Sequence, residues 1–506
     1  MVPAGGARVA PPGRGTSSGD AGAGAGGAGM DGAIEDAAAG DSLNDGPLAD
    51  ASEADALDSG ASEMGAADAG VDAPAVPTFE CGPARPKYAG SLCGPPDRPC
   101  AVLQDDVLPN SVGFHSDIPS LFLDEHDGLH VLFTAAYSEV PNGFFAEPDP
   151  ASGAWSVLAL PLRYRSGGLG RGPDGAWLAL VDAETYTSTL LWRGSDPASW
   201  TTIWSQPMDA TFAPTSTGVV SDRNGCVHAA MGTYYGRWSG AWTVTPLASL
   251  PGDYTTGTVL ALSPKGTPNV IARHDSMNDD RSSLTWEIPG STPEIVSSET
   301  RYRGARYNLL AVTSAADQRN PDVVHVFYDE DTPVRWETNA RWVDQLLYAR
   351  RDPGHWWVRK IDDGGGTWVG DCYATVLVAG LTCHRDDVTI KPIAMIASDA
   401  PDGDVRFFYT RVHTIYDQTV VCGQDPSMPC VWSGPSHFET EVVMAWPDGT
   451  VTGSAVLLRD IYPFGASAAL DSAGNIHLVF SDETSYQLQG ADYRQNPIHH
   501  VVIGPP

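Results

Sequence analysis

The chain has 506 residues and a formal net charge of −33, because 63 aspartates and glutamates outnumber 30 lysines and arginines. So acidic a surface repels phosphate backbones and anionic lipids, which argues against nucleic-acid and membrane-surface binding. No apolar run approaches the roughly 18 residues that a membrane span needs, so we expect no transmembrane segment.

Residues 1–78 form the first predicted segment, a low-complexity tail that contains no Phe, Trp or Tyr. It consists mostly of Ala, Gly, Asp and Ser, and its 13 acidic residues face only Arg8 and Arg14. A segment with little apolar surface and one sign of charge cannot offset the entropy of ordering, so we expect disorder. The tail is either a tether or an inert extension. Its start has no visible secretory signal.

Eight cysteines lie beyond this tail, and none forms a Cys-x-x-Cys pair, which argues against a zinc ribbon or a thioredoxin-type site. They are Cys81, Cys93, Cys100, Cys226, Cys372, Cys383, Cys422 and Cys430. The last four form two pairs that each close a short loop, so we predict disulfides between Cys372 and Cys383 and between Cys422 and Cys430. The pairing of the first four stays open, as does the alternative of unpaired buried thiols. Since disulfides persist in oxidising compartments, we expect an extracytoplasmic protein that is secreted, periplasmic or on the cell surface.

A repeated unit fills residues 79–506: a short apolar run, an Asp or Gly turn, and an alternating apolar run that often contains His. It is clearest between Ala469 and Phe480, where Asp471 and Gly474 supply the turn. The turn residues and the alternation predict a β-hairpin. A second tight turn before a Trp, such as Pro197 before Trp200, follows in several units. Each unit is therefore predicted to be a four-stranded antiparallel meander.

Seven such units follow one another, with turn centres at residues 128, 175, 225, 266, 322, 403 and 474. The early spacings suit propeller blades of about 40–50 residues, and the last two intervals carry insertions near 362–387 and 411–437. We therefore predict an all-β fold, a seven-bladed β-propeller of four-stranded antiparallel blades. Residues 79–110 are the predicted opening segment, in which a strand at 100–106 completes the last blade and closes the ring.

The Leu-Asp-x-x-Gly-x-x-His-x-x-Phe units and the Asp-Pro turns before Trp resemble the sialidase-like, BNR-type β-propellers of secreted bacterial proteins. The resemblance covers roughly residues 100–506 at the level of the blade pattern. It implies a propeller fold. The Ser-x-Asp-x-Gly-x-x-Trp box of sialidases is not reproduced in full; the nearest segment, from Asp149 to Trp155, lacks its order. No motif therefore assigns sialidase activity.

The predicted ligand face is the rim formed by the loops between the second and third strands and between consecutive units. Candidate ligand-binding residues there are acids that end second strands, and arginines and a tyrosine in the loops between units: Asp182, Asp275, Asp329, Glu330, Asp482, Arg163, Arg165, Arg301, Tyr302 and Arg303. The acids suit a cation or sugar hydroxyls, and the arginines suit the carboxylate of an acidic sugar. Alternatively, the acids only begin solvated loops and the arginines pair with them.

Histidines recur at one position of the unit: His130, His228, His325 and His477. Ring symmetry would hold them too far apart to share a metal ion, so we expect hydrogen bonds between blades instead. Asp275, Asp279 and Asp280 resemble a calcium loop only weakly, because they lack its glycine and terminal Glu. No cofactor is predicted. The chain also lacks a Gly-x-Ser-x-Gly elbow, a phosphate loop and a His-Glu-x-x-His motif.

Three functions fit these observations. The preferred hypothesis is a non-catalytic propeller that binds a glycan or protein ligand on its loop rim. The alternative is a sialidase-like glycoside hydrolase that acts on an acidic sugar, which needs two carboxylates about 5–10 Å apart. The third is a purely structural surface module. In each case we expect a monomer.

Overall fold

The computed structural model describes residues 80–506 except 87, 109–118, 135–142, 150–151, 153, 161–165, 173–176, 184–186, 194–199, 208–217, 249–252, 277–280, 301–308, 316–322, 334–340, 353, 371–377, 401–403, 423–429, 449–450 and 484–496. The predicted tail lies outside the described residues. The described chain folds into β-strands, as the alternating runs predicted. It contains no helix long and apolar enough to cross a membrane.

Four sheets in the first part of the described chain are four-stranded antiparallel meanders whose strand order follows the sequence. The first two contain β2 (Ser120–Leu123), β3 (Leu129–Thr134), β4 (Gly143–Pro148) and β5 (Trp155–Ala159), then β6 (Ser166–Arg171), β7 (Trp177–Ala183), β8 (Thr187–Arg193) and β9 (Trp200–Pro207). The next two contain β10 (Gly218–Ser221), β11 (Val227–Met231), β12 (Tyr234–Trp238) and β13 (Trp242–Pro246), then β14 (Asp253–Leu262), β15 (Pro268–Ser276), β16 (Arg281–Glu287) and β17 (Glu294–Thr300).

A fifth four-stranded sheet joins the two ends of the described chain. It is composed of β28 (Pro463–Leu470), β29 (Ile476–Asp482), β30 (Ile498–Gly504) and β1 (Ala101–Val107). β1 pairs antiparallel with β30, from Ala101 opposite Gly504 to Val107 opposite His499. This is the pairing predicted for the strand at 100–106. It covers an edge of β30 that would otherwise be open to pairing with another chain.

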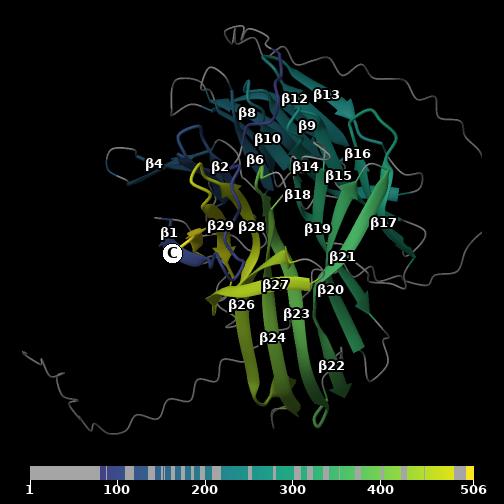
Figure 1. Ribbon diagram of the computed structural model, residues 1–506. Coiled ribbons are helices and arrows are strands. Elements are labelled where there is room, and N and C mark those ends of the chain that lie inside the picture. Colours follow the sequence, from purple (N-terminus) through teal and green to yellow (C-terminus); the bar gives the residue numbers. More distant parts are fainter. Residues whose placement is uncertain are drawn as a thin grey trace, which may run out of the picture.

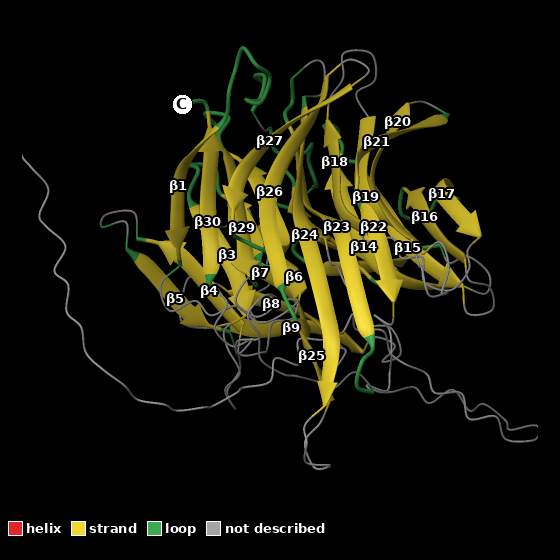
Figure 2. Ribbon diagram, turned by 90° about the horizontal axis from the view of Figure 1, so that it is seen from below, coloured by secondary structure: helices red, strands yellow, loops and turns green. Residues whose placement is uncertain are grey.

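The remaining strands form one ten-stranded sheet. They are β18 (Leu309–Ala315), β19 (Val323–Pro333), β20 (Arg341–Asp352), β21 (His355–Asp363), β22 (Gly365–Gly370), β23 (Thr382–Ala397), β24 (Val405–Cys422), β25 (Cys430–Ser433), β26 (Ser436–Asp448) and β27 (Val451–Arg459). β21 pairs only with β20, and β25 only with β24, at the side of the main path. Figure 1 shows β22, β23, β24 and β26 reaching beyond the smaller sheets, and Figure 2 shows the length of β24 from below.

The prediction of seven separate four-stranded blades is wrong. The described chain has five four-stranded sheets, and the strands predicted for the fifth and sixth units belong to the ten-stranded sheet. The cause lies in the insertions, whose residues extend β23 and β24 and form β22. β22 bonds to β20 through Trp342 opposite Gly366, and to β23 through Gly365 opposite Val388. These bonds join the two meanders into one sheet.

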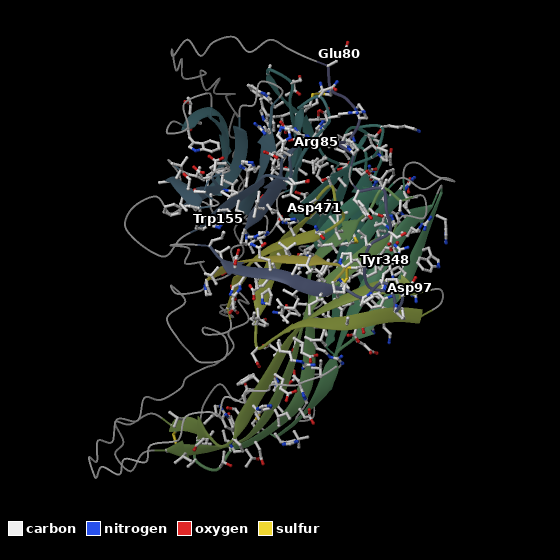
Figure 3. All side chains as sticks on the ribbon, turned by 60° about the vertical axis from the view of Figure 1, so that its left-hand side comes forward. Glu80, Arg85, Asp97, Trp155, Tyr348 and Asp471 are labelled. Atoms are coloured by element: carbon white, nitrogen blue, oxygen red, sulfur yellow. A yellow bond between two sulfur atoms is a disulfide. The ribbon has the colours of Figure 1, made fainter. Side chains whose placement is uncertain are left out.

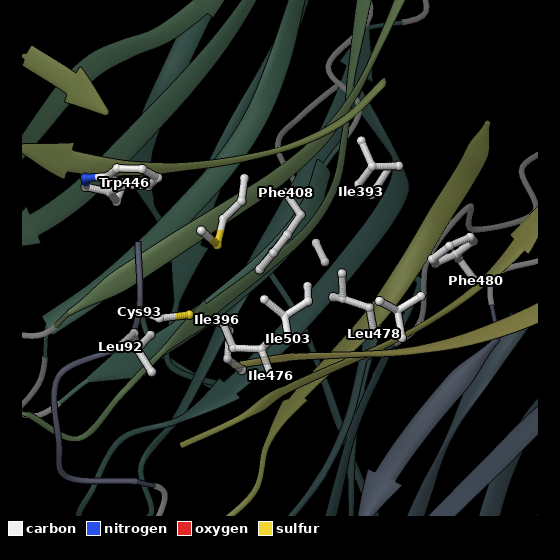
Figure 4. Packing of buried hydrophobic residues seen from close by; sticks show 14 residues of the cluster. Leu92, Cys93, Ile393, Ile396, Phe408, Trp446, Ile476, Leu478, Phe480 and Ile503 are labelled. Carbon is white, nitrogen blue, oxygen red and sulfur yellow. The ribbon is translucent and has the colours of Figure 1, made fainter. Parts of the chain in front are cut away.

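The sheets are arranged radially as a β-propeller. The innermost strands contact one another in a closed cycle, which runs β2, β6, β10, β14, β18, β23, β28 and back to β2. Apolar side chains fill the space between neighbouring sheets. One cluster packs Phe408 and Ile396 of the ten-stranded sheet against Ile503 of the closing sheet, with Leu92 and Cys93 at one end (Figure 4). Burial of such side chains supplies most of the stabilisation of the ring.

We call residues 80–100 the strap, because this segment crosses the side of the ring where first and second strands are joined by tight turns. Cys81 is disulfide-bonded to Cys226 at the β10–β11 turn. The Tyr88 carbonyl accepts a hydrogen bond from the Asp399 amide after β23. The Tyr88 ring also packs on Gly474 in the β28–β29 turn. The strap thus links three sheets before it enters β1.

Disulfides also join Cys93 to Cys100 within the strap and Cys422 to Cys430 at the far end of β24. The prediction for Cys422 and Cys430 is confirmed. Cys383 is disulfide-bonded as well. Its predicted partner, Cys372, lies outside the described residues. The four cysteines whose pairing stayed open therefore form two pairs, Cys81 with Cys226 and Cys93 with Cys100.

Candidate functional site

For most of the residues predicted for the ligand rim, the structure describes neither the backbone nor the side chain, or the backbone alone. The predicted arginine and tyrosine cluster and part of the weak calcium loop lie outside the described residues: Arg163, Arg165, Arg301, Tyr302, Arg303, Asp279 and Asp280. Asp182 and Glu330 lie in β7 and β19, but their side chains are not described. The proposed cradle for an acidic sugar on this rim therefore stays a prediction.

The three remaining acids of the rim have different surroundings. Asp275 accepts hydrogen bonds from the Arg273 guanidinium at 2.7 Å and from the Ser282 hydroxyl at 2.7 Å. Asp329 is buried within β19. Asp482 ends β29 and accepts a hydrogen bond from the Tyr462 amide at 3.1 Å. Within the described chain, none of these acids belongs to a group of three potential metal ligands.

The repeated histidines have their described hydrogen bonds within single sheets, whereas we expected bonds between blades. His228 bonds the Tyr235 hydroxyl and His325 bonds the Tyr348 hydroxyl, both at 2.6 Å. His477 bonds the His500 ring at 3.0 Å. The partners lie on adjacent strands of the same meander, where cross-strand neighbours are close enough to meet. These hydrogen bonds therefore link neighbouring strands within one sheet.

A cavity of about 530 Å³ lies between the strap and the ten-stranded sheet. We call it the strap pocket. Its charged and aromatic lining comes from Asp97 and Arg98 of the strap, and from Tyr348, Arg350, Trp357, Arg359 and Asp404 of the sheet and the β23–β24 connection. Figure 3 shows Asp97 beside Tyr348. Glu80 and Arg85, which come earlier in the strap, lie nearer the top of that view. The pocket is on the turn side of the ring, opposite the predicted ligand rim.

Strand register explains why these side chains meet. In the β20–β21 pair, Tyr348 lies opposite Arg359 and Arg350 lies opposite Trp357. Residues directly opposite each other share a face of a sheet, and so do residues two apart along a strand. All four side chains therefore project from the same face, toward the strap and the β23–β24 connection.

Trp357 is the aromatic surface of the strap pocket. It is 42% exposed, whereas the other Phe, Tyr and Trp side chains whose burial is described are buried or half-buried. The buried Tyr348 ring meets it edge-on, with centroids 6.0 Å apart, and Tyr348 is itself held by the bond from its hydroxyl group to His325. The Tyr348 ring thus holds one side of the indole in place, and the exposed surface of the indole is open to a ligand.

The charged lining of the strap pocket has three arginines and two aspartates. Asp404 is already occupied, because it accepts hydrogen bonds from the Leu92 amide at 2.7 Å and from the guanidinium of the buried Arg406. At most Asp97 is therefore left to act on a ligand. An excess of guanidinium groups in a chain of net charge −33 favours an anionic ligand at this place.

No protein-family model matches the chain, and no curated protein matches it. Among solved structures, it is similar to AofleA from Arthrobotrys oligospora, with 12% identity and a TM-score of 0.33, over 76% of this chain and 99% of that one. It is also similar to the periplasmic gluconolactonase PpgL of Pseudomonas aeruginosa, with 12% identity and a TM-score of 0.32, over 63% and 87%. An α-L-arabinanase of Penicillium chrysogenum gives 9% identity and a TM-score of 0.34, over 69% and 97%. Similarities this low assign no activity to this chain, and the sialidase-like resemblance stays a prediction.

Sequence reasoning missed the strap pocket, because it placed the ligand face on the opposite rim, the one formed by the loops. The Asp-Pro turn before Trp356 and Trp357 was visible as the start of an outer strand. Nothing in the local sequence indicated that a segment some 250 residues earlier would form the opposite wall. The only available signal was the acidic chain's unusual grouping of Arg350, Arg351 and Arg359 around that turn.

Proposed function

We propose that this protein is a carbohydrate-binding β-propeller that acts outside the cytoplasm and holds an acidic sugar in the strap pocket without catalysis. The observation that carries the proposal is the exposed, supported indole of Trp357 beside Arg350 and Arg359 in a cavity of about 530 Å³. Ligand sites of small molecules have volumes of about 300–1,000 Å³ and combine aromatic walls with a few polar groups.

The two kinds of side chain have separate tasks in this proposal. The Trp357 indole packs on the apolar face of a sugar ring. Arg350 and Arg359, which flank the indole by register, donate paired hydrogen bonds to a carboxylate on that ring. A neutral sugar would gain only the first contact, so the pocket should prefer uronic or sialic acids over neutral hexoses.

The hydrolase alternative is weaker at this pocket. A glycosidase places two carboxylates across the scissile bond. Here Asp404 is engaged by Arg406 and Leu92, which leaves Asp97 without a second carboxylate among the lining residues. The disulfides fit a protein that folds in an oxidising compartment, which supports the extracytoplasmic part of the proposal.

The test is a glycan array on the full chain, with calorimetry on any glycan that binds. We expect binding to glycans with carboxylated sugars and at least a tenfold loss of affinity in Trp357→Ala and in Arg359→Gln. Trp432→Ala is the matched control, because Trp432 is a partly exposed Trp of the same sheet in the distant strand β25. Equal affinity in Trp357→Ala and in the control would remove the strap pocket from the proposal. Mass spectrometry of the bound glycan checks catalysis, and cleavage products would favour the hydrolase.

A further inference from the structure

Four side chains with metal-binding groups converge where the strap meets the β10–β11 turn. Cys81 comes from the strap, and Asp222, Cys226 and His228 come from the turn and β11. One sulfur, oxygen or nitrogen atom of each lies within 4.8 Å of those of the others. In the described part of the chain, no other group of this kind is present.

Local geometry of the turn brings three of the four together. The Asp222 carboxylate directly follows β10, and its Oδ1 accepts hydrogen bonds from the amides of Asn224 at 2.9 Å and Cys226 at 2.8 Å. This fixes Cys226 at the start of β11. His228 lies two residues later, so both side chains leave the same face of the strand. On the other side, the Gly82 amide donates to Asp222 Oδ2 at 2.6 Å and holds the strap in place.

His228 is the observation that indicates a ligand. It is 2% exposed, and its Nδ1 is oriented by the Tyr235 hydroxyl at 2.6 Å. Its Nε2 is buried without a hydrogen-bond partner and lies 3.7 Å from Asp222 Oδ2. A buried ring nitrogen normally has a partner. One nitrogen held by a second group and the other directed at sulfur and carboxylate is the arrangement of a metal-ligating histidine.

Two equivalent turns of the ring provide an internal comparison. In them, His130 and His477 also follow an aspartate by six residues, at 3.3 Å from Asp124 and 3.4 Å from Asp471. The position of Cys226 is occupied there by a glycine and an asparagine, 128 and 475. An Asp–His pair is therefore the common structural element of these turns. Only at Asp222 do two cysteines join it, and only there does the His Nε2 lack its bond to the aspartate.

We propose that these four side chains form a tetrahedral zinc site once the disulfide between Cys81 and Cys226 is reduced. A dithiol or phosphine reductant supplies the two electrons that cleave the S–S bond, and each sulfur takes up a proton. Zn²⁺ then displaces both thiol protons and binds two thiolates, His228 Nε2 and Asp222 Oδ2. This is a ligand set that zinc prefers. The strap is thereby anchored to the ring in both redox states, by a disulfide in one and by zinc in the other.

The experiment uses the full chain, reduced with a phosphine under anaerobic conditions and then titrated with Zn²⁺ or Co²⁺. We expect one tight zinc per chain, counted with a chromogenic chelator, and the visible absorption of tetrahedral cobalt–thiolate in the Co²⁺ form. Zinc should protect Cys81 and Cys226 from alkylation, as located by mass spectrometry. Because reduction also frees the other cysteines, Cys422→Ser/Cys430→Ser is the matched control and should keep the tight site.

Cys81→Ser should abolish the tight site while it leaves the sheet β10–β13 unaltered, since Cys81 belongs to the strap. His228→Gln should weaken zinc binding by at least 100-fold. If Cys81→Ser and His228→Gln bind zinc as tightly as the unaltered chain, or if reduced protein binds none, the inference is overturned. Neither outcome depends on the sugar site, because Trp357→Ala should bind zinc normally.

Discussion

The buried Arg406 shows how one side chain can fix the strap. Its guanidinium is 1% exposed and donates to the Leu92 carbonyl at 2.7 Å, to the Cys93 carbonyl at 2.5 Å and to Asp404. Burial lowers the pKa of Arg406, while the hydrogen bond to Asp404 opposes that shift. Backbone carbonyls that leave water need such a partner. The wall of the strap pocket that the strap forms therefore depends on Arg406.

Arg406→Leu should destabilise the protein by about 3–5 kcal/mol, because it leaves two buried carbonyls without their donor and removes the cationic partner of Asp404. Arg406→Lys should recover only part of the loss, since an ammonium group cannot reproduce the planar fork. Urea unfolding followed by Trp fluorescence measures both effects. Arg459→Leu removes an exposed arginine of the same sheet and serves as the control. Equal midpoints for Arg406→Leu and the control would contradict the role given to Arg406.

The same residue marks a limit of sequence-based prediction. The partners of Arg406 in the strap are 313 and 314 residues away, so no local pattern connects them. The turn aspartates are the opposite case. Asp124, Asp222 and Asp471 bond amides two and four residues ahead, and this local geometry was predictable as a hairpin turn.

At the scale of the element, β1 closes the ring mainly through its backbone, since most of its side chains are exposed. The Leu108 amide donates to the Ile498 carbonyl at 2.9 Å. Amides of an edge strand point alternately toward the partner and away from it. The Asp106 amide therefore points toward β30, and the Val107 amide points to solvent.

Two proline variants test this closure and control for each other. Asp106→Pro should cost about 2 kcal/mol or more, because it removes a ladder hydrogen bond, whereas Val107→Pro should be nearly neutral. Thermal unfolding of both variants measures the difference. Equal melting temperatures would show that β1 contributes little to the seam. A larger loss for Val107→Pro would contradict the assigned direction of the amides.

The disulfides predict a second difference between elements. Cys81 and Cys226 are 145 residues apart, whereas Cys422 and Cys430 are 8 apart at the end of a hairpin. In the chain-entropy model, losing the first costs about 4–5 kcal/mol and losing the second about 2–3 kcal/mol. Under oxidising conditions, Cys81→Ser/Cys226→Ser should therefore lower the melting temperature more than Cys422→Ser/Cys430→Ser. The reverse order would contradict the anchoring role of the strap disulfide.

The ten-stranded sheet was beyond prediction for a physical reason. Strands are recognised by apolar residues that alternate with polar ones over a buried face. The outer half of β23 begins with the polar segment Thr382 to Asp387, in which one face is exposed and the other is covered but mostly polar. Without the apolar alternation, these residues resembled a loop. Their backbone pairing with β22 on one side and with β24 on the other shows that they belong to a sheet.

At the scale of the whole molecule, the periodicity of the sequence predicted the ring of sheets but not the number of separate sheets in it. Turn spacing predicted radial meanders and the closing strand, because both depend on local turn chemistry and on the last unit lacking a strand. The fusion of two meanders depends on hydrogen bonds between insertions that are distant in sequence. The strap pocket was also beyond prediction, because its walls come from segments some 250 residues apart in the sequence.

The seam of the ring also contains a histidine whose pKa departs strongly from its ordinary value. His500 in β30 is buried, and its ring stacks on His477 with centroids 5.2 Å apart. Burial, with the nearby His477 as the second cause, lowers the pKa of His500 to about 4. Asp106 and Asp105 of β1 oppose this shift but do not cancel it.

The stability of the whole ring should therefore fall on acidification through the window between the two pKa values of His500. The unfolded chain takes up a proton near pH 6.5 and the folded chain only near pH 4, so between these values the unfolded state binds more protons. Stability from this group is full above about pH 6.5 and is lost progressively down to about pH 4, by about 3 kcal/mol. His500→Phe cannot titrate, so its urea-unfolding free energy should decrease less between pH 7 and pH 4 than that of the unaltered chain. His437→Gln, which removes an exposed histidine, should keep the full decrease. The same pH dependence in all three proteins would show that His500 is not the group that makes the seam sensitive to acid.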